Sequence, residues 1–99
     1  MRLKPRDIEA IKWAASETFG ADAIVRLYGS RTRDELRGGD IDLLIDVASC
    51  ESEWSMAERF RERLFERIDE QKVDVVFLVR GQTPSAFVRM ILPEAVPLP

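Results

Sequence analysis

The chain has 99 residues, with 15 basic and 18 acidic side chains and a net charge of −3. This length supports one domain, residues 1–99, and leaves no room for a second, substrate-binding domain. With 45% apolar and 33% charged residues, the composition is ordinary for a soluble globular protein and excludes the disordered, collagen-like and membrane classes. The acidic balance also argues against direct binding of nucleic acid through a broad basic surface.

Histidine is absent, and Cys50 is the single cysteine. These counts exclude Ser-His-Asp and Cys-His catalysis, histidine-containing zinc sites and an intrachain disulfide. There is no basic-then-apolar leader and no run of about 18 apolar residues, so we expect a cytoplasmic protein without a membrane segment. Metal-assisted phosphoryl transfer survives this exclusion, because it depends mainly on cations, arginines and backbone amides.

The N-terminal part of the sequence predicts a helix, a strand and a second, short helix. Pro5 suits a first helical turn, apolar residues follow at helical spacing, and Gly20 offers a stop. The apolar run A-I-V-R-L-Y, residues 23–28, predicts the first strand, which a Gly-Ser turn closes. Residues 31–36 can form the short helix, and a glycine pair ends it.

The middle of the chain predicts two strands joined by a long amphipathic helix. Residues 40–47 and 73–79 are rich in apolar and β-branched side chains, as strands are. Residues 53–70 show helical periodicity, with one apolar stripe and one charged face. We expect the buried stripe to consist of Trp54, Ala57, Phe60, Leu64 and Ile68.

The C-terminal part predicts a last helix and a short tail. Thr83 can cap this helix, Pro84 can start it and Pro93 should end it. The tail, residues 92–99, either closes the core as an edge strand or is exposed for a partner. Strands that alternate with helices predict an α/β fold with a small mixed sheet of three to four strands flanked by helices. The apolar side chains of the last helix are Phe87, Met90 and Ile91.

Two aspartates, Asp40 and Asp42, lie in the strand-like run D-I-D-L-L-I-D. Side chains alternate across a strand, so both are expected to project from one face, with Cα atoms roughly 6.6 Å apart. Carboxylates with this spacing can converge on two metal ions about 3.5–4 Å apart, as in two-metal nucleotidyl transfer. Carboxylate ligands also suit Mg²⁺ or Mn²⁺ better than softer metals. The pair therefore indicates a magnesium site.

A phosphate-binding turn is expected just before this strand. Gly29 allows close approach of a phosphate to the backbone, Ser30 adds a hydroxyl, and the amides of the following turn favour anions. Arg31 and Arg33 can add positive charge. Asp74 follows a helical crossover, which commonly makes neighbouring strands parallel, so it is expected beside the two aspartates.

Each of these features has a plainer interpretation when taken alone. An Asp-x-Asp pair at a strand start is usually turn chemistry, and a Gly-Ser pair is often a simple turn with a helix cap. Trp13 and Trp54 could stack on bases, but both lie in helical apolar patterns and are expected in the core. Tyr28 is expected either in the core or facing a nucleotide, and we leave it out of the site. In combination, the features indicate a metal and triphosphate site.

Two stretches resemble the nucleotidyltransferase superfamily of DNA polymerase beta, and within it the minimal nucleotidyltransferases of bacteria and archaea. They are G-S-R-T-R-D-E-L-R-G-G-D-I-D-L, residues 29–43, and K-V-D-V-V-F, residues 72–77. The resemblance implies a nucleotidyltransferase-like fold, a triphosphate held by Gly29 and Ser30, and two Mg²⁺ ions held by the Asp-x-Asp pair. Asp74 would bind metal or help to activate the acceptor hydroxyl. The implied catalytic and metal-binding residues are Asp40, Asp42 and Asp74.

The sequence departs from the common pattern of these relatives, which often read G-S-R-A-R-G and later S-D-I-D-L. Thr32 replaces the alanine, Asp34 the glycine and Gly39 the serine. Asp34 matters most, because a position that tolerates glycine can require a positive φ, and because its negative charge lies near the expected triphosphate. None of these changes removes an expected metal ligand.

The same resemblance implies a biological role. Proteins of this kind are often encoded beside a small helical HEPN-type ribonuclease toxin and act as its antitoxin, in a type VII toxin–antitoxin pair. Some transfer AMP from ATP to a tyrosine hydroxyl of that toxin. The short chain agrees with this role, because a protein acceptor, held in a hetero-oligomer, makes a built-in substrate domain unnecessary.

Two other functions remain open on the sequence. One is a binding-only antitoxin that covers the toxin without chemistry, with the apolar tail as its contact. The other is nucleotidyl transfer to a small molecule or to RNA, which ranks lower because such enzymes usually carry additional helical segments. The intact aspartate set favours an enzyme, since a pure binder needs none of the three.

Overall fold

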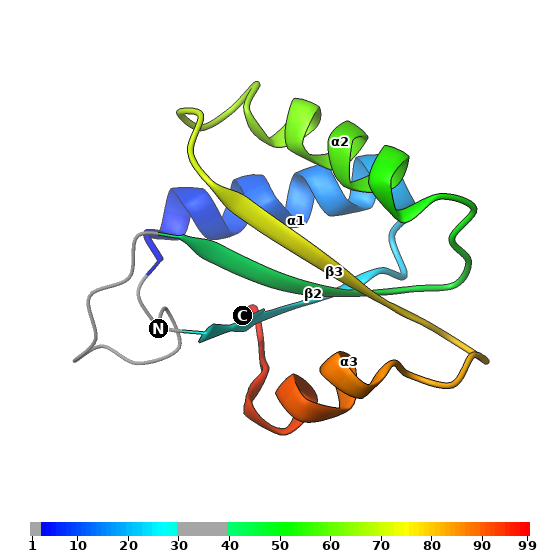
Figure 1. Ribbon diagram of the computed structural model, residues 1–99. Helices are drawn as coiled ribbons and strands as arrows, with labels where there is room; N and C mark the ends of the chain where they lie inside the picture. The colour runs from blue at the N-terminus through cyan, green and yellow to red at the C-terminus, as the bar shows by residue number, and fades with distance from the viewer. Residues whose placement is uncertain (1–2, 30–39) are drawn as a thin grey trace.

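The computed structural model describes residues 3–29 and 40–99. Within them the elements follow the order α1, β1, β2, α2, β3, α3, η2, β4. The strands form one sheet in the order β3-β2-β1-β4, with α1 and α2 over one face and α3 over the other (Figure 1). The helices are α1 (Pro5–Phe19), α2 (Glu53–Leu64), α3 (Ala86–Ile91) and the 3₁₀ turn η2 (Leu92–Glu94). The strands are β1 (Ile24–Tyr28), β2 (Ile41–Val47), β3 (Val73–Val79) and β4 (Val96–Pro97).

The sheet is mixed, which confirms the predicted α/β class. β1 pairs antiparallel with both β2 and β4, whereas β2 and β3 are parallel neighbours. The parallel pair follows from α2, because a helical crossover returns the chain to the same end of the sheet. The two parallel strands therefore start at the same end of the sheet, where the predicted aspartates lie.

Alternation along β2 divides the core into two layers. Leu43 and Ile45 belong to the main core under α1 and α2, where Phe60 is fully buried. Leu44, between them in sequence, packs with α3 instead. Burying each such side chain contributes about 1.5–3 kcal/mol, so β2 is the strand that holds the two helical layers together.

The first helix has its predicted bounds. Pro5 stands in the first turn, where a missing backbone N–H costs nothing, and the helix ends before Gly20 with its φ of 103°. Small and branched side chains at helical spacing form its buried face against the sheet. They are Ala10, Ile11, Ala14 and Ala15.

The second helix differs from its prediction in length and in one buried residue. It ends at Leu64, and the chain continues in turns rather than as helix to residue 70. Trp54 was expected in the core, but it is 76% exposed. At 3.6 residues per turn, Trp54 lies roughly 120° around the helix from Phe60, outside the stripe that faces the sheet. Trp13 is half-buried against the core, as expected, with Arg67 stacked 3.7 Å from its ring centre.

The last helix begins later than predicted. Ser85, not Thr83, is its cap, and the Ser85 hydroxyl accepts a hydrogen bond from the backbone N–H of Val88. The buried side chains are Val88 and Ile91. Phe87 and Met90, the other two apolar side chains named for this helix, are 45% and 66% exposed. A helix of only six residues presents one narrow face to the sheet, and these two side chains fall outside it.

The C-terminal tail closes the sheet as an edge strand, the first of its two predicted alternatives. Val96 pairs with Leu27, and the backbone N–H of Leu98 donates to the carbonyl of Val25 at 3.0 Å. Val96 remains 40% exposed. The tail therefore does not stand free of the fold as a separate contact segment.

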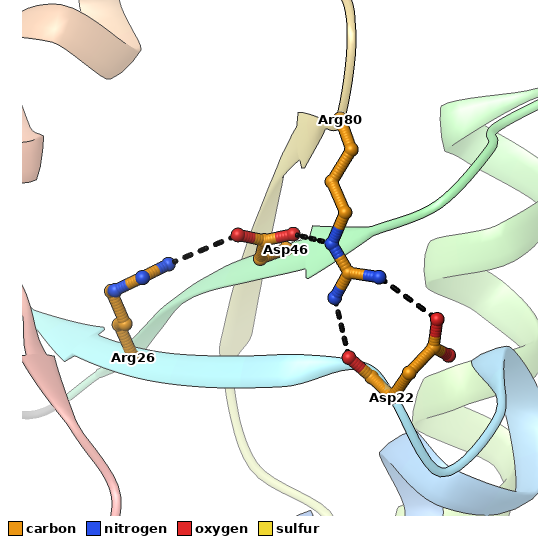
Figure 2. A network of polar contacts seen from close by, with 4 residues as sticks. All are labelled: Asp22, Arg26, Asp46 and Arg80. Atoms are coloured by element: carbon orange, nitrogen blue, oxygen red, sulfur yellow. Dashed lines mark hydrogen bonds and ion pairs between the residues drawn. The ribbon is translucent and has the colours of Figure 1, made fainter.

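An ion-pair network fastens the carboxyl ends of β2 and β3 to the turn before β1 (Figure 2). Arg80 Nε donates to Asp46 Oδ1 at 2.6 Å, and its two terminal nitrogens donate to the side chain and the backbone carbonyl of Asp22. Arg26 lies on the other side of Asp46, with 3.6 Å between Nη1 and Oδ2. Asp46 is nearly buried, so the two arginines neutralise a carboxylate that water barely reaches.

Candidate functional site

Three polar side chains form a row across the sheet. Asp42 on β2 is in register with Tyr28 on β1 and with Asp74 on β3. Neighbouring strands are about 4.8 Å apart, so side chains at the same level lie within reach of one another. Alternation places Asp42 on the same side of β2 as Leu44, which is the side that α3 covers. The fold thus brings Asp42 and Asp74 together, as the parallel crossover predicted.

Asp42 is in an unfavourable environment for a negative charge. Burial raises its pKa above the usual value, and the charges of Asp74 and Asp40, together with a hydrogen bond to Asp74, raise it further. Lys72 acts in the opposite direction. The aspartates thus form a carboxylate cluster whose repulsion a bound cation would relieve.

Asp40 lies just before β2, beside the start of β3. The backbone N–H of Ile41 donates to the carbonyl of Lys72 at 3.2 Å, which holds the two chain segments together. The ammonium of Lys72 lies 3.4 Å from Asp40 Oδ2. The two side chains are 67% and 43% exposed, so this ion pair contributes little to stability. Lys72 was not assigned to the site from the sequence, although it is the first residue of the K-V-D-V-V-F run and directly precedes β3.

Tyr28 was left out of the predicted site but belongs to its geometry. Burial and the negative charges of Asp42 and Asp74 raise the pKa of Tyr28 to about 12. The shift shows that the phenol lies close enough to the two carboxylates to feel their charge, and the phenol is protonated at neutral pH. Its position immediately before the Gly-Ser turn was the available sequence signal, because the last residue of β1 must lie beside whatever that turn binds.

Gly29 has a role that its sequence position alone did not define. Its φ is 80°, and a Cβ placed there would come within 2.5 Å of Asp42 Oδ2. The glycine therefore leaves space for a carboxylate as well as for the phosphate that we predicted. A larger residue at this position would push Asp42 out of the row.

Other predicted parts of the site lie outside the described residues. They are Ser30, Arg31 and Arg33, with the short helix at 31–36 and the atypical residues Thr32, Asp34 and Gly39. Their contacts with a triphosphate stay predictions. Within residues 3–29 and 40–99, no three carboxylate or thiol side chains are already gathered as ligands of one metal ion. Asp42 and Asp74 form the closer unit, while Asp40 is engaged by Lys72.

A comparison with known protein families identifies the family of the chain. The model of a family described as the nucleotidyltransferase domain matches residues 8–97. The chain belongs to the nucleotidyltransferase domain family. Its three helices and four-stranded mixed sheet, counted in the described residues, are consistent with that family's fold. No curated protein matches the chain.

Membership of the nucleotidyltransferase family identifies the general chemistry. The matched span contains the whole row from Tyr28 to Asp74, together with Asp40. Members of this family typically use Mg²⁺ and a nucleoside triphosphate, so nucleotidyl transfer is the indicated reaction class. In the part of the chain that the structure describes, no helix combines the length and apolar character needed to span a membrane.

Proposed function

We propose that this nucleotidyltransferase transfers AMP from ATP to a tyrosine hydroxyl of a HEPN-type ribonuclease toxin, and so acts as its antitoxin. The observation that carries the catalytic part is the in-register pair of Asp42 and Asp74 at the start of two parallel strands. The family match supports nucleotidyl transfer in general. Tyrosine as acceptor and the toxin as partner rest on the resemblance of residues 29–43 and 72–77 to minimal nucleotidyltransferases.

The aspartates fit a magnesium site. Their carboxylate oxygens are the ligands that Mg²⁺ prefers, and the raised pKa of Asp42 reflects negative charge that a cation would compensate. Asp40 joins them when its exposed ion pair with Lys72 opens, at little cost. Magnesium, when bound, would neutralise charge on the ATP phosphates and on the leaving pyrophosphate.

The reaction needs few steps from the protein itself. The acceptor hydroxyl oxygen forms a bond to the α-phosphorus of ATP, and the bond from that phosphorus to the bridging oxygen breaks, so that pyrophosphate leaves. The hydroxyl proton is lost in the same process, and we assign Asp74 to accept it. Asp42 lies between Asp74 and Tyr28 in the row, so it occupies the central position of the proposed site. Tyr28 keeps its phenol protonated and available to donate a hydrogen bond.

A cleft beside Asp74 supports an acceptor from another molecule. It measures about 650 Å³ and opens between the end of α2 and the start of β3. Arg61, Phe65 and Lys72 line it with Asp74. β3 is the outer strand of the sheet in the described residues, so this cleft is reached from outside the fold. Because α2 and α3 cover opposite faces of the sheet, this cleft meets Asp74 at the outer edge of β3, and a tyrosine of a partner protein would approach the site around that edge.

The deciding experiment is incubation of the chain with magnesium and labelled ATP, with and without the helical product of the adjacent gene. We expect label on a partner tyrosine by mass spectrometry, and none with Asp42→Asn. Asp46→Asn is the matched control, because it removes an aspartate from the same strand at the opposite end of the sheet. Labelling that persists with Asp42→Asn would exclude the assigned chemistry.

The same variant, tested for labelling and for protection of cells that make the toxin, separates the other functions. If Asp42→Asn stops labelling but still protects cells from the toxin as well as the unmodified chain, binding alone accounts for neutralisation. Label on RNA or on a small molecule, with none on the partner, would assign a different acceptor to the same site.

A further inference from the structure

An exposed aromatic ring adjoins the row on the side opposite Asp74. The rings of Phe87 on α3 and Tyr28 on β1 meet edge to face, with centroids 6.1 Å apart and an interplanar angle of 75°. Whichever ring contributes its edge, Tyr28 leaves at least one face of Phe87 uncovered. Phe87 is 45% exposed, whereas the neighbouring Val88 is buried against the sheet. The ring of Phe87 is therefore positioned by Tyr28 on one side and exposed to solvent on another.

The order of the strands gives this ring its place relative to the chemistry. Across the sheet the sequence is Tyr28, Asp42, Asp74, and Gly29 directly follows Tyr28. Asp74, with the cleft at the outer edge of β3, lies beyond Asp42 on the side away from Tyr28, where we placed the acceptor. Phe87 contacts Tyr28, which is the opposite end of the row and directly precedes Gly29. With the acceptor assigned to the Asp74 end of the row, the Tyr28 end is left for the donor nucleotide.

We propose that Phe87 binds the adenine base of ATP by stacking, with Tyr28 holding its ring in place. This inference rests on the proposed function, since it assigns a residue to bind the base of the ATP whose phosphates we assign to the aspartates and their metal ions. A planar base has the shape of one uncovered aromatic face, and stacking requires no further polar group. A single exposed ring on a six-residue helix is enough to bind a small planar ligand. A protein partner would need a larger surface with several buried contact residues.

The proposal separates recognition of the base from recognition of the phosphates. Loss of a base-stacking ring typically weakens binding about 5- to 150-fold. Phe87→Ala should therefore weaken the binding of MgATP to that extent, measured by calorimetry with the full chain. Binding of magnesium tripolyphosphate, which has no base, should stay within about twofold of the unmodified chain. Because the second ligand uses the same aspartates, its unchanged affinity also shows that the variant is folded.

Two further variants complete the test. Phe87→Trp keeps a stacking surface and should restore MgATP binding to within a few-fold. Trp54→Ala removes another exposed aromatic ring, on α2 over the opposite face of the sheet, and should change neither affinity (Figure 1). In the labelling reaction, Phe87→Ala should raise KM for ATP and leave KM for the acceptor unchanged.

The outcomes distinguish this inference from the function on which it rests. Equal binding of MgATP by Phe87→Ala and by the unmodified chain would overturn the stacking role and leave the transferase assignment intact. Parallel loss of MgATP and tripolyphosphate binding would also overturn it, since a general disturbance of the site would then explain the effect. If the unmodified chain binds neither ligand, the proposed function itself fails.

Discussion

Asp42 and Asp74 lie directly opposite each other on parallel strands, where like charges destabilise a sheet. The fold does not require this arrangement, because apolar or uncharged side chains at either position would fit the strands better. Burial adds to the cost, as the raised pKa of Asp42 indicates. A destabilising pair at the start of two parallel strands is typical of a binding site for cations.

The first prediction is that Asp42→Asn stabilises the metal-free protein. Removing one charge relieves the repulsion between the carboxylates, so Tm should rise by a few degrees in the presence of a chelator, roughly the effect of 0.5–1 kcal/mol in a domain of this size. The unmodified chain should gain about 1.4 kcal/mol at a magnesium concentration ten times Kd, and the variant should gain almost nothing. Thermal unfolding with and without Mg²⁺ measures both effects.

Asp46→Ala is the control for that measurement. It should leave the buried Nη1 atom of Arg26 without its ion-pair partner and lower the free energy of unfolding by about 1–3 kcal/mol. The stabilisation by Mg²⁺ should remain. If instead Asp46→Ala removed the magnesium response and Asp42→Asn kept it, the metal site would have been assigned to the wrong end of β2.

The second prediction concerns pH. The pKa of Asp42 is raised in the folded chain above its ordinary value of 3.8, so the folded state holds this proton more tightly than the unfolded state. The resulting stabilisation is present below the ordinary value and is lost as pH rises through the raised one. In chelator, the Tm of Asp42→Asn minus that of the unmodified chain should therefore be smallest in acid and grow toward neutral pH. A difference that stays constant with pH would contradict the assignment.

The third prediction uses the fact that Tyr28 is the single tyrosine of the chain. Absorbance of the phenolate should titrate with a midpoint near pH 12 in the folded protein, against an ordinary value of 10.0. Asp42→Asn should lower the midpoint, because one of the two charges that oppose ionisation is gone. The chain unfolded in guanidinium provides the reference. A folded midpoint near 10 would mean that Tyr28 is not held beside the carboxylates.

The fourth prediction compares two glycines whose positive φ values are nearly equal. Gly29 and Gly81 have φ values of 80° and 84°, so alanine at either should cost about 1–2 kcal/mol of stability. The added Cβ clashes with Asp42 only at Gly29, because nothing lies within 4 Å of a Cβ at Gly81 among the described residues. Gly29→Ala should therefore also abolish the magnesium response, which Gly81→Ala should retain. Equal responses in the two variants would exclude the steric role of Gly29.

Most of the fold could be predicted from the sequence, because its signals were local. Pro5 and Gly20 mark both ends of α1, and the β-branched run at 73–79 is observed as β3. The errors came from the helices, where exposure depends on how a helix is rotated against the sheet. Trp54 shows this, since it repeats with Ala57 at a helical spacing but falls outside the face that the sheet selects.

The site was predictable where topology determined it. The crossover through α2 makes β2 and β3 parallel, which brings Asp74 beside Asp42. Tyr28 and Phe87 were beyond the reach of sequence reasoning, because their contact depends on the antiparallel register of β1 and on the position at which α3 begins. A contact between the last residue of a strand and a short helix leaves no periodic pattern in the sequence.

The two ends of β2 differ in electrostatic character, and this difference has a consequence for how ligands approach. Asp46 shares its charge with two arginines, whereas Asp42 is surrounded by other carboxylates. On this face of β2, negative charge is therefore neutralised at the carboxyl end and left largely unneutralised at the amino end. A divalent cation near the sheet would be attracted to the amino end of β2 and not to the arginine end, so the charge distribution favours the end at which we propose the metal site.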